Sequence, residues 1–143
     1  MIYTFEVLGP PQPKERARAW GGRHVTPEKT RNYERLVGAV ASLRRPPDWL
    51  LDGSYRVEVH AYFADRRPRD VDNVAKSVLD GLNGVLWRDD RQVVRIASEK
   101  HVDRLRPRAE VRVELIVPEE PTKRLYALGQ PNERRRLNVR RAP

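Results

Sequence analysis

The 143-residue chain contains no cysteine, so disulfide bonds, zinc–thiolate sites and a cysteine nucleophile are all excluded. Aromatic residues make up only 7% of the sequence, which predicts a modest core built mainly from valine, leucine and alanine. No apolar run approaches the roughly 20 residues that cross a bilayer, and the first residues lack the basic and long apolar regions of a signal peptide. We therefore expect one soluble, cytoplasmic domain with no membrane partner.

Charge is unbalanced: 29 lysine and arginine residues face 20 aspartate and glutamate residues, which gives a net charge of +9. Such a balance favours a polyanionic partner, with nucleic acid ahead of an anionic membrane surface. Few of the basic residues are lysines, so a GC-rich genome that favours arginine codons is the alternative explanation.

The first half of the chain is predicted to form two strands and a helix. Alternating apolar residues predict strands over 2–9 and 54–64. A helix is expected between them, with Thr26 as its N-cap and Pro27 as its first residue, and it ends before the prolines at 46–47. The apolar face of the second strand consists of Tyr55, Val57, Val59, Ala61 and Phe63.

The second half is predicted to form a helix followed by two strands. The helix begins near Asp72, and its polar face carries Asn73, Lys76, Ser77 and Asp80. Strands over 92–102 and 108–117 are expected to run antiparallel and to be joined by the polar turn between them. The apolar stripe of the helix consists of Val71, Val74, Ala75, Val78, Leu79 and Leu82.

These elements predict an α/β (α+β) fold, a single domain with a mixed, largely antiparallel sheet of about four to five strands and two main helices. The domain is expected to span residues 1–118. Residues 119–143 carry seven basic and three acidic side chains with little periodicity, and are expected to be a basic extension, partly disordered or docked on a partner. Its arginines at 134–136 and 140–141 are either a DNA-binding arm or incidental.

Aspartates gather around the second helix, and two of them, Asp70 and Asp72, lie at or just before its first turn. Residues two apart in an extended segment share a face, so both carboxylates can hold one Mg²⁺, which takes oxygen ligands. Lys76 lies one turn from Asp72 and can interact with it. Asp89 and Asp90 follow the helix, but sequence spacing does not say whether the chain returns them to Asp70.

A purely structural role is the alternative for each of these residues. Asp72 is an acceptable N-cap, Asp70 can simply be exposed, and Lys76 can form a salt bridge with Asp72. The sequence RDDR at 88–91 can be a neutralised surface turn. A D-x-D pair alone is therefore weak support for a metal site.

The wider pattern is more specific than the D-x-D pair. The chain combines D-x-D-N-x-x-K-x-x-x-D-x-L from Asp70 with W-x-D-D-x-Q-V from Trp87, and both are preceded by the sequences PKERAR and HVTPEKTRNYERLV. This combination resembles the RusA-type Holliday junction resolvases, which are common in phages and prophages. The resemblance covers roughly residues 2–117.

The resemblance implies a homodimeric, Mg²⁺-dependent endonuclease of DNA recombination and repair that nicks four-way junctions symmetrically, with Mn²⁺ as a candidate substitute. The family's metal-binding acids correspond to Asp70, Asp72 and Asp90, with Asp89 as the alternate, and its functional lysine to Lys76. Two other functions stay open: a less selective nuclease acting on other branched DNA, and a basic DNA-binding protein without catalysis.

Basic residues on both sides of the first helix are the candidate DNA contacts. A phosphate-contacting loop is predicted at the N-terminal side, and three arginines are predicted to frame the site entrance. The loop residues are Lys14, Arg16, Arg18 and Arg23, and the entrance residues are Arg66, Arg67 and Arg69.

The remaining aromatic and imidazole side chains receive no catalytic role. Trp20 and Trp87 can stack on junction bases, but a packing role is favoured for Trp87. His24, His60 and His101 are widely scattered in the sequence, and we expect ordinary surface or sheet histidines.

Overall fold

A computed structural model describes residues 1–116, except for the side chains of Arg18 and Trp20. The predicted C-terminal extension at 119–143, its arginines and the domain boundary at 118 lie outside the described residues. Within 1–116, none of the helices is long and apolar enough to cross a membrane.

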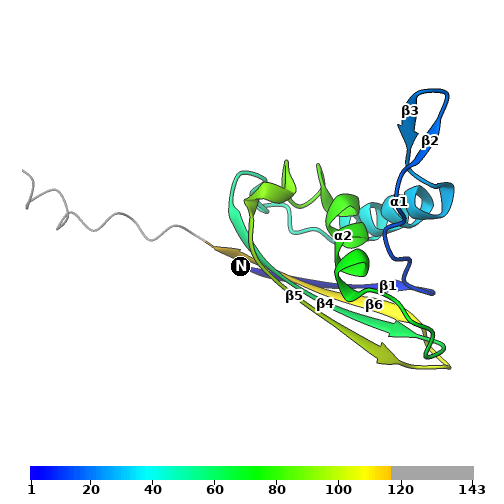
Figure 1. Cartoon of the computed structure of the whole chain (residues 1–143). Coiled ribbons are helices and arrows are strands. Elements are labelled where there is room, and N and C mark those ends of the chain that lie inside the picture. Colours follow the sequence, from blue (N-terminus) through cyan, green and yellow to red (C-terminus); the bar gives the residue numbers. More distant parts are fainter. Residues whose placement is uncertain (117–143) are drawn as a thin grey trace, which may run out of the picture.

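A four-stranded mixed sheet forms the base of the molecule (Figure 1), and its strand order is β1-β6-β4-β5. Only the β4–β5 pair is parallel, while β6 pairs antiparallel with both β1 and β4. The strands are β1 Ile2–Leu8, β4 Ser54–Phe63, β5 Val93–Val102 and β6 Arg108–Ile116.

Both α-helices cover one face of this sheet (Figure 1), and a small two-stranded ribbon stands beyond them. The helices are α1 Glu28–Leu43 and α2 Val71–Leu82, the ribbon consists of β2 Arg18–Trp20 and β3 Arg23–Val25, and a short 3-10 helix η1 spans Asp90–Gln92. The predicted fold class is confirmed: one α+β domain with a mixed, largely antiparallel sheet and two main helices.

The last two strands run antiparallel and are joined by a turn, as predicted, but they are not neighbours in the sheet, because β4 lies between β5 and β6. The chain leaves β4, returns through α2 and enters β5 in the same direction as β4, which is the crossover that parallel strands require. The turn after β5 then passes the end of β4, where Asp103 N donates to Phe63 O over 2.8 Å.

The start of α1 also differs from the prediction. Pro27 is the N-cap itself rather than the first helical residue, and no side chain caps this end. The second helix begins at Val71, with Asp70 as its N-cap.

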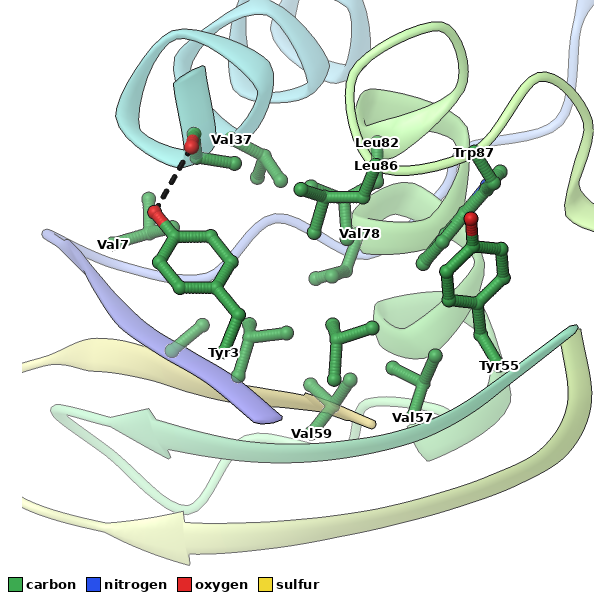
Figure 2. Packing of buried hydrophobic residues seen from close by; sticks show 14 of the residues in the cluster. Tyr3, Val7, Val37, Tyr55, Val57, Val59, Val78, Leu82, Leu86 and Trp87 are labelled. Atoms are coloured by element: carbon green, nitrogen blue, oxygen red, sulfur yellow. Dashed lines mark hydrogen bonds between the residues drawn. The ribbon is translucent and has the colours of Figure 1, made fainter. Parts of the chain in front are cut away.

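Alternating residues of β4 meet the helices in the core (Figure 2). The predicted apolar face of β4 is buried throughout, as are Val37 of α1 and Val78 and Leu82 of α2. Tyr3 of β1 reaches up to α1 and donates its hydroxyl to Ala41 O over 2.9 Å. Trp87 is fully buried and donates to Asn83 Oδ1 over 2.8 Å, so its predicted packing role is confirmed.

The two helices touch through their backbones at a pair of glycines. A Cβ added to Gly38 would lie 2.8 Å from the carbonyl oxygen of Gly81, and one added to Gly81 would lie 2.6 Å from Glu34 O. Both distances are too short for any side chain, so glycine at these positions fixes how closely α2 lies on α1.

Candidate functional site at the start of the second helix

Asp70 and Asp72 occupy the N-terminal end of α2, where the helix dipole favours negative charge. Asp70 has extended backbone angles, and its side chain makes no capping hydrogen bond. Among the described residues, its carboxylate accepts a hydrogen bond from Asn73 Nδ2 alone, over 3.3 Å. Both aspartates are exposed, so the first turn presents two carboxylates whose oxygens remain available to a ligand.

Lys76 lies one turn further along the same helix and is exposed. Among residues 1–116 it forms no salt bridge, so the alternative of a structural pair with Asp72 has no support there. Ser77, predicted on the same polar face, is instead fully buried. Its single hydroxyl proton is shared between Gln12 O, 2.6 Å away, and Val74 O, 2.9 Å away.

Arginines in the loop before the helix are held in place by Asp65. Its carboxylate accepts from the Arg69 guanidinium over 2.8 Å and from Arg67 N over 3.0 Å, and these hydrogen bonds lower the pKa of Asp65 to about 2. The Arg69 guanidinium also lies 4.3 Å from the centroid of the Phe63 ring. Arg66 and Arg67 are exposed beside it, so this loop presents positive charge next to Asp70.

The basic N-terminal segment is anchored along the same helix. Lys14 N donates to Asn73 O over 2.8 Å, which places the residues that lead into the β2–β3 ribbon beside the first turn of α2. Arg16 and Arg23 in this region are exposed.

Lys14 itself is engaged inside the protein. Its ammonium lies 2.5 Å from Glu34 Oε1 on α1 and 2.7 Å from Asp80 Oδ2 on α2. Burial lowers the pKa of Lys14, but the hydrogen bonds with Asp80 and Glu34 outweigh this effect, so the net shift is upward. This charge therefore joins the two helices and is not free to contact DNA.

Asp89 and Asp90 follow α2 and differ in their contacts. Asp89 caps η1: its carboxylate accepts from Arg91 N over 2.9 Å and pairs with the Arg91 guanidinium, which holds the pKa of Asp89 below its usual value. Asp90 makes no side-chain hydrogen bond or salt bridge with the described part of the chain. Of the two, Asp90 is therefore the one whose oxygens are available to a metal.

The fold separates Asp90 from Asp70 and Asp72. Ser98 Oγ lies 3.4 Å from Val71 O, so the start of α2 lies beside Ser98 of β5. Val93 lies five residues before Ser98 on β5, which at 3.3 Å per residue is a distance of about 16 Å. Asp90 comes before Val93 and therefore lies at the same far end of the strand. The 12 residues of α2 give a similar length of about 18 Å. Within residues 1–116 the three carboxylates do not all lie within 4.8 Å of one another.

The residues at the start of α2 fit a hard cation. Carboxylate oxygens are the ligands that Mg²⁺ prefers, and one or two carboxylates with several waters complete its shell. The donor set of Asp70 and Asp72 meets this requirement, and Lys76 and the arginines beside it can neutralise a phosphate.

Sequence reasoning missed a second cluster. His60 and His101, expected to be unrelated, lie side by side because the parallel register of β4 and β5 pairs the residues around them. The sequence shows that each histidine lies in a predicted strand. Only the pairing of β4 with β5 shows that the two histidines lie on the same face of the sheet and next to each other.

Comparison with known proteins places the chain among the nucleases. The family model described as "Endodeoxyribonuclease RusA" matches residues 8–114. The chain also resembles a Bacillus subtilis (strain 168) protein, "Uncharacterized protein YqaN", with 31% identity over a region that covers 76% of this chain and 93% of that protein. The chain belongs to the RusA endodeoxyribonuclease family.

Proposed function

We propose that the protein is a Mg²⁺-dependent endodeoxyribonuclease that resolves four-way DNA junctions by paired, symmetric nicks. It would act in DNA recombination and repair as a homodimer, and Mn²⁺ would substitute for Mg²⁺. The observation that carries this proposal is the convergence of Asp70, Asp72 and Lys76 on one exposed helix end inside the region matched by the family.

Each residue has a chemical role in this reaction. Asp70 and Asp72 would hold the ion, which when bound lowers the pKa of a water and neutralises charge on the scissile phosphate. Lys76 would donate to the phosphate oxygens as their charge develops. Arg66 and Arg67 beside the site, together with Arg16, Arg18 and Arg23 of the N-terminal segment, would contact the DNA backbone.

The distance of Asp90 from Asp70 and Asp72 suggests why a dimer would be needed for catalysis. The Asp90 carboxylate lies too far along the molecule to share an ion with Asp70 and Asp72 of the same copy. We propose that Asp90 reaches the ion from a second copy, so that each site combines the start of α2 of one subunit with η1 of the other.

The activity is tested with wild type and Asp70→Asn on a labelled immobile four-way junction and on linear duplex, in Mg²⁺ or EDTA. We expect paired nicks on the junction only, with Mg²⁺ only, and junction binding without cutting by Asp70→Asn. Equal cutting of duplex would indicate a less selective nuclease. Tight binding without cutting in any divalent metal would indicate a DNA-binding protein in which the acids are structural.

The shared site is tested by mixing two inactive variants, Asp70→Asn and Asp90→Asn. In the mixed dimer one site contains both substitutions and the other contains none, so we expect cutting to reappear in one strand per junction. If all the acids of a site belonged to one subunit, the mixed dimer would have no intact site and would stay inactive.

A further inference from the structure

Two histidines and one glutamate gather on the open face of the sheet. His60 on β4 alternates with the buried residues that face the helices, so it points away from α2. His60 Nδ1 lies 3.1 Å from His101 Nε2 on β5. Glu99 Oε2 lies 3.5 Å from the His60 nitrogen and 3.4 Å from the His101 nitrogen. Nitrogen and oxygen atoms this close are joined either by an ordinary hydrogen bond, in which one ring nitrogen carries the proton, or by a metal ion.

The size of this triangle matches tetrahedral coordination. With metal–ligand bonds of about 2.05 Å, neighbouring ligand atoms are about 3.3 Å apart in a tetrahedron and about 2.9 Å apart in an octahedron. The observed separations of 3.1, 3.4 and 3.5 Å are close to the tetrahedral value. Two imidazoles and one carboxylate, with water in the fourth position, form a ligand set that Zn²⁺ uses, whereas Mg²⁺ prefers oxygen alone.

The surroundings hold the cluster ready and leave it accessible. Tyr62 stacks on the His101 ring with centroids 4.7 Å apart, which restricts the orientation of that ring. The side chains of His60, His101 and Glu99 are 37%, 33% and 62% exposed, so an ion can enter and a fourth ligand can face solvent. The chain has three histidines and no cysteine, so imidazole ligands outside this cluster are limited to His24.

We propose that His60, Glu99 and His101 form a binding site for Zn²⁺ or a chemically similar transition-metal dication. A bound ion would join the edge strand β5 to β4 across the sheet. The site lies on the other face of the sheet from Asp70 and Asp72, and it differs from them in ligand chemistry.

The test uses untagged, metal-stripped full-length protein carrying Asp70→Asn and Asp72→Asn, so that neither a tag nor the helix site contributes. Calorimetric titration with Zn²⁺ is expected to show one equivalent bound. His60→Gln and His101→Gln should each weaken binding by at least about 10-fold, while His24→Gln should leave it unchanged.

A second measurement does not depend on the variants. Co²⁺ added to the same protein should give the intense visible absorption of a tetrahedral site, and Zn²⁺ should displace it. Absence of Zn²⁺ binding, or equal Zn²⁺ affinity in the protein with and without His60→Gln, would overturn the proposal and leave a hydrogen bond between the rings.

Discussion

Replacement of Lys14 by methionine should destabilise the protein, because it removes the positive charge that lies between Glu34 and Asp80. The two carboxylates would then face each other at no more than about 5 Å, a range at which like charges repel. Their side chains are only 19% and 21% exposed, so water compensates them in part.

The expected loss lies between two limits. Breaking a fully buried ion pair costs about 3–5 kcal/mol, and breaking an exposed pair costs about 0–1 kcal/mol. At this degree of burial we expect Lys14→Met to lower the free energy of unfolding by about 2 kcal/mol. The assay is urea unfolding followed by the fluorescence of the buried tryptophans, and Lys29→Met on the exposed face of α1 is the matched control.

A triple variant distinguishes the uncompensated charges from lost packing. Lys14→Met combined with Glu34→Gln and Asp80→Asn removes all three charges and should recover most of the loss, because the penalty lies in the unpaired carboxylates. The reasoning would be refuted if Lys14→Met cost no more than Lys29→Met, or if the triple variant were as unstable as Lys14→Met.

Three other expectations concern the helix crossing and the two ends of α2. Gly81→Ala should lower the free energy of unfolding in urea by about 2 kcal/mol, although alanine is favoured over glycine in a helix interior by about 1 kcal/mol. A higher free energy of unfolding would show that α1 and α2 can move apart. The NMR titration midpoint of Asp65 should be about 2 and should rise toward 3.8 in Arg69→Gln; an unchanged midpoint would contradict the assigned partner. Because this pKa is depressed by folding, the contribution of Asp65 to stability is present above its ordinary pKa and is lost as the pH falls through about 2. Asp89→Ala should lower the urea midpoint of unfolding, whereas Asp90→Ala should leave this midpoint unchanged and abolish junction cleavage. If Asp90→Ala destabilised the protein and Asp89→Ala abolished cleavage, Asp89 would be the metal ligand and Asp90 the structural residue.

The helices and strands were predicted well, because an element that buries one face has apolar residues at a regular spacing in the sequence. The alternation in β4 is buried as expected, and so are Val74, Val78 and Leu82 of α2. A phosphate-contacting loop was predicted from Lys14 to Arg23, and the β2–β3 ribbon forms part of this region.

What the sequence did not predict depends on contacts between distant segments. The order of β4, β5 and β6 follows from the crossover through α2, which no local pattern specifies. The same pairing brings His60 to His101. Helical spacing assigned Ser77 to the polar face, but its burial depends on the backbone of Gln12, which is 65 residues away in the sequence.

The helix α2 determines both where Asp70 and Asp72 lie and why Asp90 of the same copy cannot join them. The Gly38–Gly81 contact sets α2 against α1, and the same helix carries Asp70 and Asp72 at its start and leads to Asp90 after its end. A rigid element about 18 Å long cannot bring its own ends together. On the proposed arrangement a two-fold axis solves this problem, because it pairs the start of each helix with the region after the end of the other. Two complete sites then form together, which is what a junction cut symmetrically in two strands requires.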